Sequence, residues 1–350
     1  MSDSPAREPL PVRRAVRRST TASRAGGSVA VLAVAALAAL PRWADASALR
    51  LIVEAVCLLV LAQMWNLLAG YAGLVSVGQQ AYVGIGGYAL VVLADWAGVD
   101  PFLCVPLGGL IAALIAVPVS RVAFRFQGGY FAIGTWVIAE VFRLIVANTQ
   151  ALGGGSGQSL IAMRAYPKTA RELLTYWVAL ALLVVTLAAM HLVLRSRLGL
   201  GLAAMRDSEI AAESQGIDVA ATKLWVYVAA ALGSGTAGAL YFLMNLRISP
   251  DAAFGVNWSA WIIFIVVIGG IGTLEGPIVG TLLFFVLRET LADYGAWYLI
   301  ALGALAVVTM LAFPRGLWGG VARRFDLHLF AVQRRVAAGA SGRDPAPDAR

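Results

Sequence analysis

The chain has 350 residues, of which 60% are hydrophobic and 13% are charged. Soluble domains are nearer half apolar and a quarter charged, so this composition excludes an ordinary soluble protein. The formal net charge is +8, and the basic residues gather in the two tails and one central loop. This distribution is typical of the charges that set membrane topology, so it gives no reason to expect nucleic-acid binding. We predict an all-α fold, a polytopic helical bundle integral to the membrane, with about eight to ten transmembrane helices and some broken or re-entrant segments.

The amino-terminal residues 1–27 are polar and rich in arginine, which predicts a disordered basic cytoplasmic tail. A short apolar run at residues 29–40 follows, and small residues come after it, so a cleaved signal peptide is one interpretation. We favour a retained first span, because an arginine-rich lead is typical of a cytoplasmic anchor and a polytopic protein needs no cleaved leader.

A glycine-rich segment at residues 70–88 follows the second predicted span, residues 49–68. Glycines at this density let helices approach closely or let a helix break inside the membrane. Gln79 and Gln80 lie in this segment, and their amides are costly beside lipid, so both should face protein or a wet cavity. Tight packing and pore lining are both open interpretations, and on the second Gln79 and Gln80 line a translocation path.

Charged residues orient the next spans. Asp95 and Asp100 follow the third span with no basic residue between them, which predicts a periplasmic loop. Arg121 and Arg125 come after the fourth span and return the chain to the cytoplasm. The fifth span, residues 130–147, therefore leads outward again.

The fifth span carries two ionisable residues, Glu140 and Arg143. They are three positions apart and share one helix face, so they can neutralise one another. Facing lipid they would be expensive, and we therefore predict an internal pair. A structural clamp is the preferred interpretation, and contact with a substrate in the translocation path is the alternative.

The polar stretch 148–172 should be periplasmic. It contains the glycine-rich run 153–157, but no Gly-Lys-Ser/Thr follows, as it would in a phosphate-binding loop. The whole chain contains no Gly-Lys dipeptide. It is therefore not expected to bind ATP through such a loop.

A long polar loop, residues 195–223, separates two apolar flanks that are each long enough to cross a bilayer. Its basic residues place it on the cytoplasmic side. The sequence predicts one helix from Leu202 to Gln215, ended by Gly216 in a left-handed conformation. Arg206 and Glu209 are spaced to pair across one turn. A docking helix for another protein and a solvated connecting loop are both compatible with these residues.

The last long apolar block, residues 258–287, is long for one span and short for two. Basic residues in the tail 321–350 predict a cytoplasmic carboxyl terminus, and only a break in the block gives the required even number of crossings. Glycines and one proline favour a break in the middle. The residues assigned to this helix break are Gly272, Glu275, Gly276 and Pro277.

Four stretches, taken in order, resemble the LivM-like permeases of bacterial ABC importers for branched-chain amino acids. They are residues 70–88, 128–144, 197–241 and 266–283. The resemblance extends over about residues 50–320. In the third stretch the matching residues are Arg206, Asp207, Glu209, Ala211, Ala212, Glu213, Gly216, Ile217 and Lys223.

The resemblance implies a permease domain over residues 28–320 of a protein of the bacterial inner membrane, with both termini cytoplasmic. It implies that the loop 195–223 carries the coupling helix that inserts into a cleft on an ATPase subunit. The residues to which it gives this ATPase-coupling role are Arg206, Asp207, Glu209, Ala211, Ala212, Glu213, Gly216 and Ile217.

The implied partners are two ABC ATPase subunits, a second, LivH-like permease, a periplasmic substrate-binding protein and membrane lipid. ATP is bound by the partner subunits, so no cofactor of its own is expected. Branched-chain amino acids are the implied substrates, but relatives carry urea, amides or aromatic acids. The pair Gln79-Gln80 departs from the family pattern, which leaves the substrate open.

Two other classes of protein remain as alternatives. A stand-alone secondary transporter would need intramembrane ionisable groups for ion coupling, and Glu54, Glu140 and Glu289 are candidates. A membrane enzyme finds no support, because the sequence has no nucleophile elbow, paired-carboxylate motif or metal cluster. Cys57 and Cys104 have no metal-ligand spacing. We therefore expect neither catalytic residues nor a bound metal.

Overall fold

The structure is a computed structural model that describes residues 16–17, 21–291, 297–312, 316–325 and 335–336. Its longer helices are α1 (Thr21–Ala39), α2 (Ala46–Asn66), α3 (Gln79–Val91), α4 (Pro101–Ala123), α5 (Gly129–Ala147), α6 (Lys168–Arg195), α9 (Val219–Asn245), α11 (Asn257–Gly269), α12 (Gly276–Leu291) and α13 (Trp297–Ala312). The shorter helices are α7 (Arg197–Asp207), α8 (Glu209–Ser214), α10 (Pro250–Phe254) and α14 (Gly316–Phe325).

Strands are confined to two short antiparallel pairs in the described residues. β1 (Val16–Arg17) pairs with β4 (Arg335–Val336), and β2 (Gln158–Ser159) pairs with β3 (Arg247–Ile248). Each strand has two residues. The predicted all-α class is therefore confirmed.

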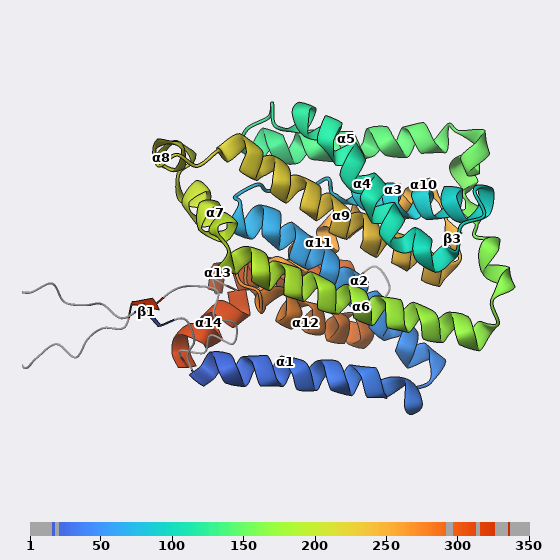
Figure 1. Cartoon of the computed structure of the whole chain (residues 1–350), viewed down its shortest axis with the longest axis horizontal. Helices are drawn as coiled ribbons and strands as arrows, with labels where there is room; N and C mark the ends of the chain where they lie inside the picture. Colours follow the sequence, from blue (N-terminus) through green and yellow to red (C-terminus); the bar gives the residue numbers. More distant parts are fainter. Residues whose placement is uncertain (1–15, 18–20, 292–296, 313–315, 326–334, 337–350) are drawn as a thin grey trace, which may run out of the picture.

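Among the described residues, six helical stretches are long and apolar enough to cross a membrane. They are Ala46–Tyr71, Pro101–Ala123, Gly129–Ala147, Lys168–Arg195, Val219–Asn245 and Pro250–Gly269. They run roughly side by side along the long axis of the molecule (Figure 1). This is the architecture of a polytopic helical membrane protein, and the predicted total of eight to ten spans stays a prediction.

The first helical break lies after α2. A π-helical turn, η2 (Leu67–Tyr71), ends this helix, and residues 72–78 are non-helical up to the start of α3. Trp65 on α2 donates its indole N–H to the Ser76 carbonyl at 2.7 Å. The Val77 amide donates to the Thr135 hydroxyl on α5 at 3.1 Å. The glycine-rich segment therefore contains a break that side chains of neighbouring helices hold in place.

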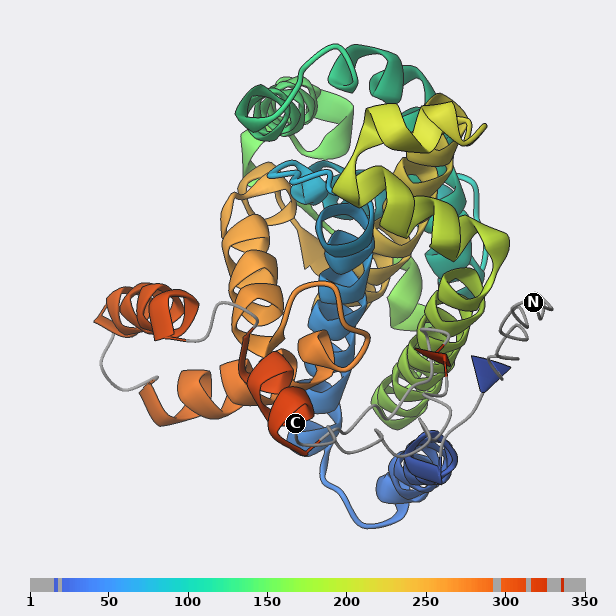
Figure 2. The same ribbon diagram turned by 90° about the vertical axis from the view of Figure 1, so that its left-hand side faces the viewer.

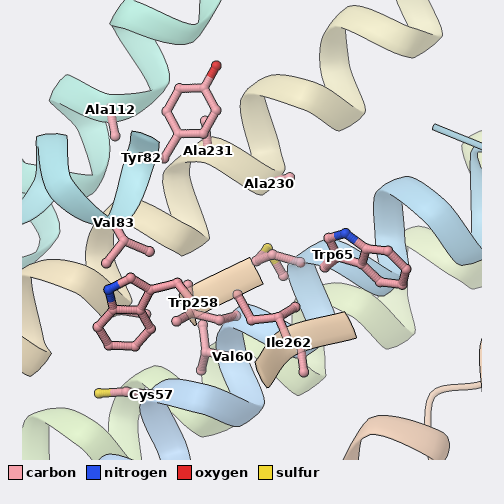
Figure 3. Packing of buried hydrophobic residues seen from close by; sticks show 14 of the residues in the cluster. Cys57, Val60, Trp65, Tyr82, Val83, Ala112, Ala230, Ala231, Trp258 and Ile262 are labelled. Atoms are coloured by element: carbon pink, nitrogen blue, oxygen red, sulfur yellow. The ribbon is translucent and has the colours of Figure 1, made fainter. Parts of the chain in front are cut away.

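α2 and α9 occupy the centre of the bundle. In their membrane-crossing windows 72% and 78% of the residues are buried, against 28% for α5. In the end-on view α2 (blue) is surrounded by other helices, and α1 (dark blue) lies at the edge (Figure 2). Side chains from α2, α3, α4, α9 and α11 meet in the core, among them Trp65, Tyr82 and Trp258 (Figure 3).

Glycines set the spacing between α3, α4 and α9. A methyl group added at Gly86 would overlap the Gly235 carbonyl, and one at Gly238 would overlap the Val83 carbonyl. The backbones therefore approach as closely as small residues allow. α9 carries a packing face of small residues, formed by Gly233, Gly235 and Gly238.

The loops at the β2–β3 end are held by two aspartates. Asp95 accepts the backbone amides of Ile161 and Ala162 at 3.1 and 2.7 Å. Asp100 caps the start of α4 and accepts a hydrogen bond from the Tyr166 hydroxyl. That hydroxyl donor holds the pKa of the Asp100 carboxyl below its ordinary value. Stretch 148–172 is thus fastened to the loop between α3 and α4.

The predicted tails fall partly outside the described residues. Residues 1–15 and 18–20 of the predicted tail 1–27 lie outside them, and α1 already begins at Thr21. At the other end α14 crosses the predicted boundary at residue 321. Residues 326–334 and 337–350 of the predicted tail 321–350 also lie outside the described part.

Replacing Gly86 by alanine should lower the thermal midpoint of the solubilised protein. The new methyl would force α3 away from α9, and overpacking of this kind costs about 1–3 kcal/mol. Gly303→Ala in α13 is the matched control, because its added methyl meets no atom within 4 Å. Thermal unfolding in detergent checks this, and an unchanged midpoint for Gly86→Ala would contradict the close helix contact.

Candidate functional site

A polar segment projects from one end of the bundle. The α7–α8 segment, residues 197–214, lies beyond the ends of α6 and α9 (Figure 1). Ser196 caps α7 by accepting the Leu198 amide at 3.1 Å. Ser208 caps α8 by accepting the Ala211 amide at 3.3 Å. The segment is thus two short capped helices.

The expected single helix from Leu202 to Gln215 is therefore wrong. Ser208 has an extended backbone, with φ −163° and ψ 116°, and it interrupts the helix. A serine side chain that hydrogen-bonds nearby backbone amides competes with helix continuation and favours a cap. Because of this break the axis of α8 does not continue the axis of α7.

Gly216 ends α8 in a Schellman motif. It has φ +81°, the left-handed conformation that glycine adopts most readily. Its amide donates to the Glu213 carbonyl at 2.9 Å, and the Ile217 amide donates to the Ala212 carbonyl at 3.1 Å. These two bonds define the motif. The prediction that Gly216 stops the helix is confirmed.

The residues predicted to contact an ATPase differ in exposure. Ala212 is fully buried and Ile217 is half-buried, so these two face the bundle. The other six are exposed: Arg206, Asp207, Glu209, Ala211, Glu213 and Gly216. Ile210 is 80% exposed, and sequence reasoning missed it because α8 has no apolar stripe. Ile210 thus gives α8 one large exposed apolar side chain.

The predicted pairing of Arg206 with Glu209 is wrong. The Glu209 carboxylate pairs instead with the Lys223 ammonium on α9 at 2.6 Å. The Arg206 guanidinium lies 3.5 Å from Asp207 and donates to the Gly70 carbonyl at 3.2 Å. The interruption at Ser208 removes the helical turn that would have brought Arg206 and Glu209 together. Instead, each residue contacts a different part of the bundle.

The second helical break lies in the apolar block 258–287. α11 ends at Gly269 and α12 begins at Gly276, and we call the residues between them, 270–275, the α11–α12 turn. Gly270 and Gly272 have φ +132° and +75°. Glu275 is buried, with 8% of its surface exposed. Of the residues assigned to the break, Gly272 and Glu275 lie in the turn, and Gly276 and Pro277 open α12.

Gln79 and Gln80 point into protein. Both side chains are almost fully buried at the start of α3. The Gln79 carbonyl accepts the Ser234 hydroxyl of α9 at 2.9 Å, and the Gln80 carbonyl accepts the Ser259 hydroxyl of α11. The Gln80 amide nitrogen has no hydrogen-bond partner among the described residues. The two amides join three helices, and the Gln80 amide nitrogen is left available to a further acceptor.

Glu140 and Arg143 form an ion pair with a third member. Arg143 binds Glu140 at 2.6 Å and Asp251 of α10 at 2.7 Å. The Glu140 side chain is 43% exposed, so this expected internal pair lies at the surface of the described chain. Because Arg143 bridges α5 and α10, it acts as a clamp between them.

A second ion pair joins α2 and α12. Arg288 donates to both carboxylate oxygens of Glu54, at 2.7 and 3.0 Å. Its guanidinium also lies 5.2 Å from the centre of the Phe285 ring. A bidentate pair of this kind is geometrically specific and charge-assisted.

These features define a multi-pass membrane protein with a polar segment that projects from one end and buried polar side chains at its helix breaks. The comparisons with known proteins give the family. Residues 47–313 match the family model described as branched-chain amino acid transport system / permease component. The chain belongs to this family.

Individual proteins that are similar in sequence support the same family. The chain is 31% identical over 278 residues to the high-affinity branched-chain amino acid transport system permease protein LivM of Escherichia coli (strain K12), and 30% identical to its namesake in Salmonella typhimurium. Each match covers 72% of this chain and 65% of the relative, just under two thirds of its length. A probable LivM of Methanocaldococcus jannaschii is 24% identical over 190 residues, which are 54% of each chain. No solved structure matches the chain.

Removing one partner of the Glu54–Arg288 pair should destabilise the bundle. Arg288→Gln leaves the Glu54 carboxylate without this partner inside the helix bundle, at an expected cost of about 1–3 kcal/mol, because the pair is only partly exposed. The double variant Glu54→Gln/Arg288→Gln should recover part of that loss. Glu289→Gln, which removes a neighbouring exposed charge, is the control. Thermal midpoints that are additive across the cycle would show that the pair is not energetically coupled.

Proposed function

We propose that the chain is the permease subunit of a bacterial ABC importer and that it translocates branched-chain amino acids. The single observation that carries the proposal is the α7–α8 segment within a chain of this family. Two capped helices project beyond α6 and α9 and present charged groups and the exposed Ile210. An exposed surface of this kind, which mixes charged and apolar groups, suits a cleft on another protein.

Energy for transport would come from partner subunits. Separate ABC ATPase subunits, two in number, would bind ATP and receive the α7–α8 segment. A second, LivH-like permease would complete the translocation path, and a periplasmic binding protein would deliver the substrate. The names of the relatives, which specify a branched-chain amino acid transport system, support this assignment.

In this proposal the α7–α8 end is cytoplasmic and the β2–β3 end is periplasmic. Arg195, Arg197, Arg206 and Lys223 at the first end support that orientation. Both termini would then be cytoplasmic, in the bacterial inner membrane. The stretch 148–172, fastened by Asp95 and Asp100, would face the binding protein.

The translocation path is proposed to pass near two pairs of polar residues in the spans, the Gln79–Gln80 pair and the Glu140–Arg143 pair. The unpartnered Gln80 amide is a donor available to a substrate carboxylate when the helices part. Arg143, held between Glu140 and Asp251, is a clamp in this conformation that could also meet a charged solute. Gln79 is expected to position Gln80, because both amides are tied to neighbouring helices.

The stand-alone secondary transporter is less well supported by the contacts. Two of its three candidate ion-coupling carboxylates, Glu54 and Glu140, are already bound by arginines. A carboxylate neutralised by an arginine is poorly suited to take up and release a proton or cation. The third, Glu289, is exposed at the end of α12.

Uptake into proteoliposomes tests the proposal. The chain, co-reconstituted with the subunits that purify with it and with the binding protein, should accumulate labelled leucine only when ATP is supplied on the α7–α8 side. Labelled urea and benzoate, run in parallel, separate the other substrate classes of the family. Leucine uptake that needs no ATP would favour a secondary transporter and contradict the proposal, and ATP-driven uptake of urea or benzoate alone would contradict the substrate.

A further inference from the structure

The α11–α12 turn is held by side chains of α2. The Gln63 amide donates to the Leu274 carbonyl at 2.8 Å. Asn66 makes two bonds, because its amide nitrogen donates to the Thr273 carbonyl and its oxygen accepts the Gly272 amide, both at 2.8 Å. Gln63 and Asn66 are fully buried and three positions apart on one helix face. These side-chain hydrogen bonds satisfy backbone groups of the α11–α12 turn that would be bonded to other backbone groups in an unbroken helix.

Two glycines bring the turn against the end of α2. A methyl group built on Gly70 would lie 2.6 Å from the Gly272 amide nitrogen, so the two backbones are in direct contact. The Gly70 carbonyl that accepts Arg206 would lie 3.2 Å from a methyl on Gly272. Figure 2 looks onto this end of the bundle, where the turn (orange) lies beside α2 (blue).

Arg206 reaches the same point from outside the core. Its Nη1 donates to the Gly70 carbonyl and would lie 3.4 Å from a methyl group on Gly272. The side chain is 46% exposed and belongs to α7. Three segments far apart in sequence therefore meet at one place: α7, the end of α2 and the α11–α12 turn.

We propose that Arg206 and Asn66 form a mechanical linkage between the α7–α8 segment and the α11–α12 turn. Arg206 attaches α7 to Gly70, and Asn66 attaches the end of α2 to Gly272 and Thr273. A displacement of the α7–α8 segment then moves α2 together with the ends of α11 and α12 that flank the α11–α12 turn. Both residues are positioning residues. The inference rests on the proposed function, because docking of an ATPase supplies the displacement.

Hydrogen–deuterium exchange on the complete complex tests the linkage, in nanodiscs and with and without ATP and vanadate. In the wild type, nucleotide should change exchange both in the α7–α8 segment and in the α11–α12 turn. In Asn66→Ala the α7–α8 segment should respond as in the wild type, because the buried Asn66 cannot touch an ATPase. The response of the turn should be lost, and ATP-driven uptake should fall about fivefold or more.

Two further variants provide a substitute for Asn66→Ala and a control. Arg206→Ala removes the other half of the linkage from a partly exposed position, and it serves if Asn66→Ala does not fold. Arg125→Ala removes an exposed arginine at the end of α4, and its exchange should match the wild type. A turn that still responds in Asn66→Ala or Arg206→Ala overturns the linkage. An α7–α8 segment that ignores nucleotide in the wild type overturns the proposed function instead.

Discussion

In a bilayer a broken helix leaves backbone donors and acceptors that water cannot reach, and each costs free energy unless another group binds it. Within the described ranges, two helix breaks lie near the α7–α8 end, at residues 72–78 and 270–275. Trp65, Gln63 and Asn66, all on α2, bind carbonyls and an amide in those breaks. Leaving one such group unsatisfied costs about 1–3 kcal/mol, so the position of both breaks depends on α2.

Close packing makes that arrangement possible. α2 and α9 are the most buried of the spanning helices, and glycines on α3, α4 and α9 let backbones touch. A core of this density has few intermediate arrangements, so in the proposed transport cycle it would move as rigid pieces. The breaks beside α2 are places where such pieces can hinge. Arg206 of the α7–α8 segment binds the Gly70 carbonyl, just before the first break.

The sequence predicted the features that depend on local pattern. The apolar lengths predicted the helical membrane bundle, and the left-handed preference of glycine predicted the end of α8 at Gly216. Local pattern could not predict the long-range contacts. Asn66 binds Gly272 and Thr273 in the α11–α12 turn, which are 206 and 207 residues away along the chain. The cap at Ser208 and the choice of Lys223 as partner of Glu209 were also missed, since a side-chain cap and a tertiary ion pair overrode the helical spacing.

The proposed transport mechanism depends on docking of an ATPase to the α7–α8 segment. Co-purification from a mild membrane extract tests it most directly, with the native chain and with Glu209→Ala and Gly216→Val variants that still insert. An ABC ATPase subunit should be recovered with the native chain and lost from both variants. Recovery of the native chain without any ATPase, or equal recovery of the ATPase with both variants, would contradict it.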